Sequence, residues 1–586
     1  MPQKNALLVY PKFGASFWSF KHALQYLGKK SSMPPLGLLH LAGMFPKHYN
    51  LRLVDMNVQP LTNTDIQWAD VLFTSTMIVQ RKSLDGVILH ANCAGKPVVA
   101  GGPHPTSYWD EIKGVNHFIL GEVEDTFPRF LQDFENDTAE HIYPAPLKRP
   151  AVTCTPMPRY DLINMRAYGS MLLQFSRGCP FDCEFCDITK LYGRVPRTKT
   201  NEQMLAEFDL LYSLGWRGSL FLVDDNFIGN RRDAMRLLKA LIPWQAARDY
   251  PFELNTEASM NLVKYEELMD AMIRAGFTSV FVGIETPTPE ALKITKKPQN
   301  VSADDPEFAL HAIRTLQKKG FIVSGGFILG LDGETPKVFD LHIEFIQLAA
   351  VPMAMEGLLT VLKGTDLYFR MEREGRLRGD TTGNNLDTRL NFVPEMDEHI
   401  LTAGYKRVLN AIYDRGLDNY FARCWTLLQH LDRSRAPRPM HTPLRPTEIM
   451  RFALASLRQL LSPQGPAYLR FLSRVITHHP DMLWEAFALT AKGYHLHKIM
   501  EQVTAVDDLR QYLTMTISSL HDAATRRIPE TRERMEASAR DIISRIRKDY
   551  QTIHPDFVPD VQEAICAFYA ELGKIIPGSN LPHLMG

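Results

Sequence analysis

Three cysteines on one short stretch, Cys179, Cys183 and Cys186, are the clearest chemical signal in the sequence. Their spacing is C-x3-C-x2-C. Three thiolates on one loop can each bind one iron of a [4Fe–4S] cluster and leave the fourth iron without a protein ligand. A structural zinc site would instead use four closed ligands, usually as two distant pairs, and the sequence offers no second pair. We therefore predict an iron–sulfur cluster with an open iron; zinc or three buried cysteines are the less favoured alternatives.

The other four cysteines, Cys93, Cys154, Cys424 and Cys566, are far from one another in the sequence. A chain of 586 residues does not need disulfides to be stable, and this pattern is not a disulfide framework. Unpaired cysteine usually behaves as a small buried hydrophobic residue. We therefore expect these four side chains to be structural and buried.

The composition is that of a globular protein with balanced charge. Lysine plus arginine and aspartate plus glutamate both number 66, so the formal net charge is zero. Such a balance gives no sign of a nucleic-acid partner. The N-terminus lacks the features of a signal peptide, and no apolar run reaches the roughly 18 residues of a membrane span. We expect a cytoplasmic protein that binds no nucleic acid, and we leave peripheral membrane contact open.

The first of two blocks that could position the cysteines covers residues 1–140. Short apolar runs at 6–10, 51–54, 71–74, 97–100 and 117–120 alternate there with helical patterns at 36–45, 82–92 and 125–134. Such alternation predicts an α/β fold with a parallel, doubly wound sheet, which is Rossmann-like and of the flavodoxin type. A proline-rich stretch then predicts a linker over 141–165.

The second block covers residues 166–378, and the cysteines follow its first apolar run. The runs lie at 171–175, 219–223, 252–255, 279–283, 321–327 and 357–361, with helical segments at 201–214, 232–244, 265–275, 306–319 and 336–348. Six βα units predict a partial (β/α)6 barrel of the TIM type. A polar stretch at 380–390 predicts a loop within a linker over 379–397. Helical periods, including an amphipathic helix at 537–550, predict an α-helical cap domain over 398–586.

The cysteine motif, with Phe185 directly before its last cysteine, resembles that of the radical S-adenosylmethionine (SAM) superfamily. Other motifs follow in the family's order, at the ends of successive predicted strands. Asp224, Asp225 and Asn226 resemble the element that contacts the amino group of SAM, and a carboxylate suits an ammonium group. Glu257 ends the next strand and would face the same mouth of the barrel.

Two further strand ends resemble the elements that bind the nucleoside part of SAM. Glu285 matches the ribose-binding position. Gly326, Ile328 and Gly330 match the first part of the family pattern GxIxGxxE, which approaches the adenine. The glutamate of this pattern falls one place late, at Glu334, so we do not assign it.

The N-terminal block resembles the cobalamin-binding domain that precedes many radical SAM domains. The resemblance implies contacts to cobalamin from residues at the strand ends: Ser75, Thr76, Gly101, Gly102, Pro103, Gly121 and Glu122. The Asp-x-His-x-x-Gly signature of a lower axial histidine is missing, because Asn57 follows Asp55 and Met56 at that place. His104 is a weaker candidate, since a lone loop histidine is more often hydrogen-bonded or exposed.

The resemblance implies a radical SAM enzyme that methylates an unactivated carbon with the help of cobalamin and an external electron donor such as flavodoxin or ferredoxin. The C-terminal region resembles the domain of unknown function in a subgroup that includes the hopanoid C-2 methylases. The substrate stays open, as a small molecule or a lipid. Radical coupling, cyclisation or rearrangement is an alternative, and methylthiolation is a weaker one. A non-catalytic iron–sulfur carrier or sensor is the alternative of another class.

Overall fold

The computed structural model describes residues 3–379, 381–434, 436–437, 446–525, 532–554 and 557–575. The chain divides into two compact units, of which the first joins Met1–Phe13 to Trp18–His495 and the second joins Gly14–Phe17 to Leu496–Gly586. The first unit contains every residue that the sequence analysis connects with a cofactor. The division lies after His495, inside the region that we expect to be the cap domain.

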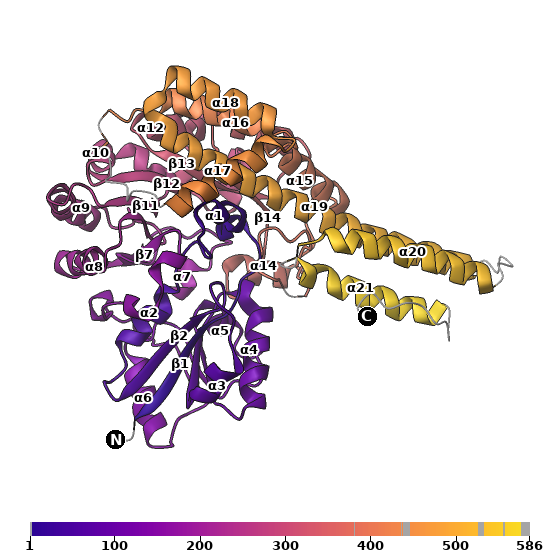
Figure 1. Cartoon of the computed structure of the whole chain (residues 1–586), viewed down its shortest axis with the longest axis horizontal. Coiled ribbons are helices and arrows are strands. Elements are labelled where there is room, and N and C mark those ends of the chain that lie inside the picture. The colour runs from indigo at the N-terminus through magenta and orange to yellow at the C-terminus, as the bar shows by residue number, and fades with distance from the viewer. Residues whose placement is uncertain are drawn as a thin grey trace. The chain divides into compact units, whose positions relative to one another are not determined.

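The N-terminal part of the first unit is a six-stranded parallel sheet with the order β2-β1-β3-β4-β5-β6 (Figure 1). The first five positions match the flavodoxin-type order, which confirms the predicted fold. The strands are β1 (Lys4–Tyr10), β2 (Tyr49–Asp55), β3 (Val71–Ser75), β4 (Val98–Gly101), β5 (His117–Ile119) and β6 (Ile142–Tyr143). The short β6 lies at the start of the stretch that we expected to be a linker.

Successive side chains of this sheet pack against different helical layers. Leu72 of β3 shares a core cluster with Leu84 and Val87 of α4. The next residue, Phe73, contacts Phe127 of α6, with ring centroids 5.9 Å apart. Both faces are therefore buried, which explains why the strands read as continuous apolar runs. The helices are α1 (Lys21–Leu27), α2 (Leu36–Gly43), α3 (Asn63–Trp68), α4 (Arg81–Cys93), α5 (Pro103–Tyr108) and α6 (Thr126–Glu135).

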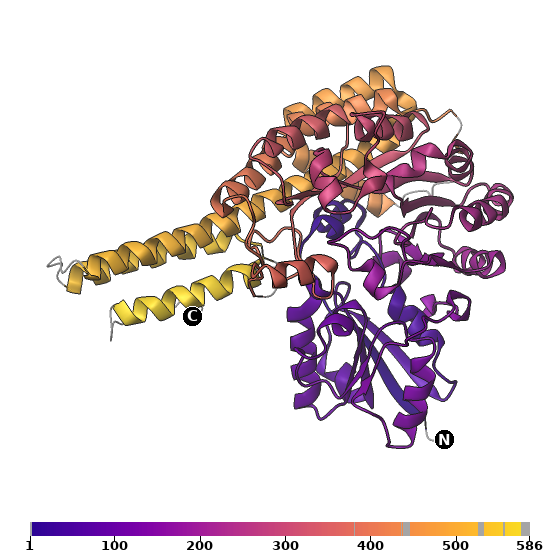
Figure 2. The same ribbon diagram turned by 180° about the vertical axis from the view of Figure 1, so that it is seen from behind.

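The central part is a second six-stranded parallel sheet, with the order β14-β13-β12-β11-β10-β7, and it confirms the predicted partial barrel (Figures 1 and 2). Its strands are β7 (Met171–Leu173), β10 (Gly218–Leu222), β11 (Phe252–Glu257), β12 (Phe277–Glu285), β13 (Ile322–Leu329) and β14 (Ala354–Leu358). The connecting helices are α7 (Ile188–Leu191), α8 (Asn201–Ser213), α9 (Arg231–Ala246), α10 (Glu266–Arg274), α11 (Pro289–Ile294), α12 (Phe308–Lys318), α13 (Val338–Leu348) and α14 (Asp366–Arg373). A small antiparallel pair, β8 (Ser176–Arg177) and β9 (Arg197–Thr198), flanks the cysteine loop.

The last strand of this sheet begins three residues earlier than its apolar run predicts, at Ala354 instead of residue 357. The reason is Glu356, a charged residue in the middle of the strand that is fully buried. Its carboxylate lies 3.1 Å from Nδ1 of His342 on α13. A buried charge of this kind needs a partner, and that partner cannot be recognised from the local sequence pattern.

Helices follow the barrel: α15 (Glu398–Ile412), α16 (Asp418–His430), α17 (Pro446–Leu460), α18 (Gly465–His478) and α19 (Leu483–Thr525). Helix α15 covers the outer strand of the barrel sheet, because Tyr413, directly after it, donates to the carbonyl of Ala354 at 2.7 Å and accepts its N–H at 3.0 Å. These contacts satisfy backbone groups at the sheet edge. The second unit contains α20 (Arg532–Thr552) and α21 (Val558–Ile575), and α20 includes the helix predicted at 537–550.

Two remaining expectations concern the surface. Among the described residues, no helix has both the length and the apolar character needed to cross a membrane. Cys424 is buried as expected, but Cys93, Cys154 and Cys566 are exposed, so the expectation is wrong for these three. The loop predicted at 380–390 is free of helix and strand over 381–390, and Asp380 lies outside the described residues.

Candidate active site

The cysteine loop connects β8 to α7 and is held by backbone contacts. The N–H of Gly178 donates to Oδ2 of Asp225 at 2.7 Å, and the N–H of Cys179 donates to the carbonyl of Gly193 at 3.2 Å. Gly178 has φ +96°, and a Cβ there would lie 2.8 Å from that same carbonyl oxygen. Only glycine fits this tight approach, which explains the residue directly before the first cysteine.

The three thiols form a group that suits an iron–sulfur cluster. Burial raises the pKa of Cys179 and Cys186, and the nearby thiols raise it further. Positive irons would reverse this effect, because a bound metal stabilises the thiolate. In the described part of the chain, no three His, Cys, Asp or Glu residues are placed to hold a single metal ion. The cysteine loop instead suits a cluster, in which each iron takes one thiolate.

Two amides point at the cysteine sulfurs. Nδ2 of Asn226 lies 3.9 Å from Sγ of Cys179, and Nε2 of Gln299 lies 3.5 Å from Sγ of Cys183. Hydrogen bonds to thiolate sulfur stabilise the negative charge and tune the potential of a cluster. Gln299 was not predicted, because it lies on a separate loop more than a hundred residues after the cysteines.

Three carboxylates gather where β10 and β11 end, as the sequence motifs predict. Burial raises the pKa of Asp224 to about 7 and that of Asp225 to about 6. For Glu257, burial and then the charges of the two aspartates raise the pKa to about 8. Like charges that repel one another in a buried place favour a cation among them. The group therefore suits the amino group of SAM.

These predicted residues also fix the cysteine loop. Oδ1 of Asp224 accepts the N–H groups of Phe175 and Ser176, while its Oδ2 is buried without a partner in the described structure. Asn226 accepts the N–H of Ser259 at 3.2 Å. In the described part of the chain, the carboxylate of Glu257 accepts no hydrogen bond, whereas its backbone carbonyl accepts the N–H of Phe227 at 2.9 Å. Asp224 and Asn226 thus hold backbone in place, and Glu257 is the carboxylate most open to a ligand.

Glu285 ends β12 in a left-handed conformation, with φ +68°. A non-glycine residue in this region is strained and is often found at functional sites. Its Oε1 accepts from Nζ of Lys297, which lies 5.8 Å from the ring of Phe185. Burial alone would lower the pKa of Lys297, but Glu285 and the thiols of Cys183 and Cys186 outweigh it and raise the pKa. Lys297 was not predicted, since an isolated lysine gives no sequence signal.

The glycine motif at the end of β13 lies beside the cysteine loop. Ile328 and Phe185 pack on one apolar cluster that includes Leu331 and Leu359. Gly326 is backed by the ring of Phe281, 3.1 Å from its ideal Cβ position. Phe185 and Ile328, predicted from separate motifs, are therefore brought together.

Glu334, which the sequence analysis left unassigned, closes the loop after β13. Its Oε2 accepts the N–H of Gly330 at 2.9 Å and that of Leu331 at 3.1 Å. Burial raises the pKa of Glu334 to about 6, and His342 is the largest opposing influence. Although Glu334 lies one position later than in the family pattern, its carboxylate still binds the backbone of the loop after β13.

Behind this loop lies a buried polar chain. His342 places Nδ1 3.1 Å from Oε2 of Glu356 and Nε2 3.2 Å from Oγ1 of Thr286. Burial alone would lower the pKa of His342, but Glu356 and then Glu334 outweigh it and raise the pKa. The chain connects β14 and the end of β12 to the Gly330 loop.

In the N-terminal domain, the predicted cobalamin residues surround a set of polar atoms at the ends of β3 and β4. Gly102 has φ +93°, and a Cβ there would lie 2.7 Å from Oγ of Ser75 and 2.8 Å from the N of Thr76. Gly101 ends β4, and Pro103 begins α5. The hydroxyl of Thr76 and both ring nitrogens of His104 are buried without a partner in the described structure. Buried polar groups are normally paired, so this cradle suits a polar ligand.

The place of the missing axial histidine is filled by a closed set of hydrogen bonds. Asn57 donates to Oδ1 of Asp55 at 2.8 Å and accepts the N–H of Phe13 at 3.1 Å. Tyr168 donates to Oδ2 of Asp55 at 2.9 Å. His104 is neither exposed nor hydrogen-bonded through its ring, and burial and then Arg81 lower its pKa to about 4. Its imidazole is therefore neutral.

Glu122 has a different surrounding from the one we expected. It pairs with Arg177 at 2.9 Å, with Arg197 at 2.6 Å and more distantly with Arg149 at 3.8 Å. Arg177 also pairs with Glu124 at 2.7 Å. Glu122 thus meets the residues around the cysteine loop, while Gly121 turns the chain just before it. This buried network was not predicted, although Arg177 lies two residues before the first cysteine.

Comparisons with known proteins agree with this geometry. The model of the radical SAM superfamily matches residues 173–346, and that of a domain of unknown function, DUF4070, matches residues 365–508. The chain is 44% identical over 413 residues to the uncharacterized methyltransferase sll1242 of Synechocystis sp., covering 70% of this chain and 76% of that protein. It is 36% identical over 399 residues to the hopanoid C-2 methylase of Rhodopseudomonas palustris, covering 67% and 74%. The chain belongs to the radical SAM superfamily, in the family of these two proteins.

Solved structures show a shared fold. The radical SAM methyltransferase TsrM of Kitasatospora setae, solved with cobalamin and a [4Fe–4S] cluster, has a TM-score of 0.51 at 16% identity, covering 78% of this chain and 96% of that one. The cobalamin-dependent SAM radical enzyme OxsB, solved with aqua-cobalamin, has a TM-score of 0.55 at 14% identity, covering 86% and 80%. At these identities the likeness shows the fold alone.

Proposed function

We propose that this protein is a radical SAM methyltransferase that adds a methyl group to an unactivated carbon, with cobalamin in its N-terminal domain. The observation that carries the proposal is the buried pairing of Glu122 with Arg177, because it fixes a loop of the predicted cobalamin site against the cysteine loop. The names of the two curated relatives support methyl transfer. The name of the second relative supports an apolar, lipid-like substrate.

Different residues of the barrel would bind the cluster and SAM. When bound, the cluster supplies the electron that cleaves SAM to a carbon radical, and cobalamin supplies the methyl group. The three cysteines hold the cluster. Glu257 and Asp225 receive the amino group of SAM, since both carboxylates are buried and repel each other without a cation. Asp224 holds the backbone that leads into the cysteine loop, and Asn226 reaches the sulfur of Cys179.

The nucleoside end of SAM would lie toward the other predicted residues. Glu285 has one carboxylate oxygen on Lys297, and the other would accept from a ribose hydroxyl. Ile328 and Phe185 supply an apolar surface for the adenine, and Gly326 and Gly330 let the backbone come close to its ring. Radical chemistry at this site depends on excluding water, which these buried side chains do.

In the N-terminal domain, the cradle at the ends of β3 and β4 would take the cobalamin tail. Ser75, Thr76, Gly101, Gly102 and Pro103 form this cradle. Gly121 lines it from the neighbouring strand. We revise the assignment of Glu122, which acts through Arg177 on the cysteine loop instead of contacting the cofactor directly.

The functional division of the chain follows from these assignments. Residues 1–140 are the cobalamin domain and residues 166–378 the SAM domain, joined by the linker at 141–165. Residues 379–397 lead to the cap helices, which begin at 398. An external donor such as flavodoxin or ferredoxin reduces the cluster, which suits a reducing, cytoplasmic setting.

The proposal is tested by anaerobic reconstitution with iron, sulfide and hydroxocobalamin, followed by counting both cofactors per chain. About four irons and one corrinoid per chain are expected. With SAM carrying a deuterated methyl group, a reductant and a hopanoid, the product should gain that methyl group and 5′-deoxyadenosine should form. A full cluster without any bound corrinoid would contradict methyl transfer and favour coupling or rearrangement. A bound cluster that never cleaves SAM would favour a carrier or sensor.

A further inference from the structure

A tryptophan from the N-terminal segment lies inside the barrel. Trp18 follows β1 and lies on the single helical turn Phe17–Ser19. Its ring centroid is 5.1 Å from that of Phe281 on β12 and 6.1 Å from that of Phe221 on β10. All three rings are only partly buried. They form a wall that we call the aromatic wall: Trp18, Phe221 and Phe281.

Strand register shows that the aromatic wall faces the barrel interior. The neighbours of Phe281 along β12, Val280 and Val282, are fully buried against the helices. Successive side chains of a strand point to opposite faces, so Phe281 points inward. Phe281 also pairs with Glu257 on β11. The aromatic wall therefore lies at the level of the carboxylate that we assign to SAM.

Below the aromatic wall the barrel is closed by polar side chains that satisfy one another. Nδ2 of Asn255 donates to Oγ of Ser219 at 3.0 Å, and Ser279 donates to Oδ1 of Asn255. Each of these residues lies two positions before an inward-facing residue, which is Phe221, Glu257 or Phe281. A ligand that enters the barrel interior would therefore contact the aromatic rings before it contacts these polar side chains.

The segment that carries Trp18 is firmly held by the helices of the same unit. Phe20 has φ +47°, a strained conformation that turns the chain into α1. Its ring lies 5.4 Å from that of His495. Tyr26 of α1 donates to Oε1 of Gln459 on α17 at 3.2 Å. A segment held in this way presents Trp18 in a fixed position.

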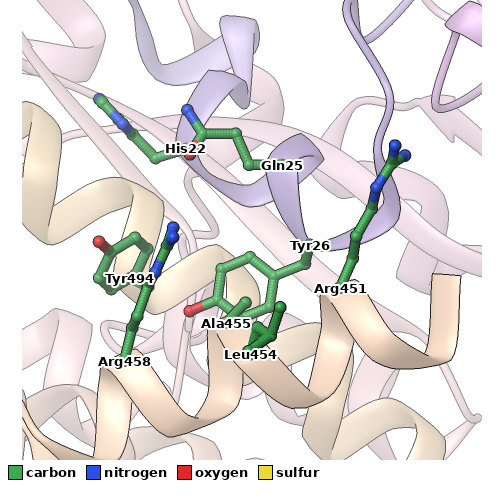
Figure 3. Close-up of a pocket in the computed structure, with 8 residues that line it drawn as sticks. All are labelled: His22, Gln25, Tyr26, Arg451, Leu454, Ala455, Arg458 and Tyr494. Carbon is green, nitrogen blue, oxygen red and sulfur yellow. The ribbon is translucent and has the colours of Figure 1, made fainter. Parts of the chain in front are cut away.

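The anchoring helices enclose a small cavity next to this segment. The cavity has a volume of about 130 Å³ and lies between α1, α17 and α19 (Figure 3). Figure 3 shows the ring of Tyr26 beside Leu454 and Ala455, with His22 and Gln25 on the same helix, α1. The ring of Tyr26 also packs edge-on against Phe452 and Tyr494, with centroids 6.3 and 5.7 Å away, so α1 is held by both α17 and α19.

We infer that Trp18 is a specificity-determining residue that holds an apolar, fused-ring substrate against Phe281 and Phe221 beside the SAM site. This inference rests on the proposed function. A fused hydrocarbon ring has no group for the polar side chains below the aromatic wall, but its flat or alicyclic face packs well on aromatic rings. The target carbon would then lie at the level of Glu257, beside the bound SAM. The N-terminal domain thereby contributes to substrate choice as well as to cofactor binding.

The test compares Trp18→Ala, Trp18→Phe and Trp425→Phe in the full-length, reconstituted protein. Trp425 is a partly buried tryptophan of α16 that packs against His478 and His479, with ring centroids 5.7 and 5.6 Å away, and serves as the matched control. Iron, corrinoid and SAM binding are measured first. We expect all three variants to keep them.

Methyl transfer to a hopanoid and release of 5′-deoxyadenosine are then measured in parallel. For Trp18→Ala we expect product to fall at least about tenfold while deoxyadenosine formation continues, because one well-packed ring contact is worth about 1.4 kcal/mol. Trp18→Phe should recover much of the product, and Trp425→Phe should match the wild type. Equal product per deoxyadenosine in Trp18→Ala and wild type would overturn the inference. No product or deoxyadenosine from the wild type itself would instead count against the proposed function.

Discussion

Nη1 of Arg177 lies 2.9 Å from Oε2 of Glu122, so the residue two places before the first cysteine is paired with the end of the N-terminal sheet. Both side chains are almost fully buried. Two charges out of water stabilise each other only as long as both are present, and removing one leaves the other unpaired. The pair therefore connects the N-terminal sheet firmly to the cysteine loop, and so connects the two proposed cofactor sites.

Replacing Arg177 by alanine should destabilise the protein strongly. Glu122 and Glu124 would remain buried, and the expected loss in the free energy of unfolding is about 3–5 kcal/mol. Denaturant unfolding of the apoprotein measures it. Arg159→Ala is the matched control, because its pair with Asp161 is exposed and should contribute about 0–1 kcal/mol. Similar losses for both variants would contradict this buried connection.

Replacing Glu257 by glutamine should weaken SAM binding and leave the cluster intact. The variant keeps the shape of the side chain but removes the charge that would meet the amino group, at a cost of about 1.5–3 kcal/mol or roughly a 10- to 100-fold rise in Kd. Equilibrium dialysis of SAM and an iron assay measure the two effects. Glu253→Gln, at the other end of β11 and bonded to Thr278, serves as control and should leave Kd unchanged. A parallel loss of iron would mean that Glu257 supports the cysteine loop instead.

The sequence predicted both sheets and the cysteine motif because these depend on local patterns. The buried partners were missed, because each lies far away along the chain. Arg177 and Glu122 are 55 residues apart, and a charged residue gives no local sign that it is buried. Because Glu356 is charged, the apolar pattern also placed the start of its strand three residues too late. The role of Trp18 could not be predicted either, because its aromatic contacts are to strands of the second sheet.

Replacing His342 by glutamine should change how stability depends on pH. The pKa of His342 is raised above its ordinary value of 6.5. The protonated imidazole therefore stabilises the folded state fully below about pH 6.5, and this contribution is lost as the pH rises through the higher folded pKa. The difference in unfolding free energy between wild type and His342→Gln should shrink between pH 6.5 and the folded pKa. Urea unfolding across this range measures it, and a difference that grows with pH would contradict the raised pKa.

The same variant should also affect SAM. His342 lies against Thr286, and Glu334 holds the backbone of Gly330. Loosening this chain should raise KM for SAM more than it lowers kcat, since the loop binds the cofactor without touching the reacting atoms. Glu334→Gln should show the same pattern. An unchanged KM with a reduced kcat would contradict a positioning role.

Replacing Gly102 by alanine should remove corrinoid binding and spare the cluster. A Cβ there would lie 2.7 Å from Oγ of Ser75 in a backbone conformation with φ +93°. The surrounding residues would therefore have to shift, or the new methyl group would occupy the space of the ligand. Gly95→Ala is the matched control, because Gly95 also has a positive φ of +66° but no atom lies within 4 Å of its Cβ position. Gly95→Ala bears a left-handed backbone cost of about 1–2 kcal/mol, whereas Gly102, with ψ −178°, lies in a region that only glycine adopts readily, so Gly102→Ala adds both backbone strain and a clash in the cradle. Absorbance spectra of the reconstituted proteins should therefore show corrinoid in Gly95→Ala and not in Gly102→Ala, with equal iron. Corrinoid bound at wild-type level in Gly102→Ala would place the cofactor elsewhere on the sheet.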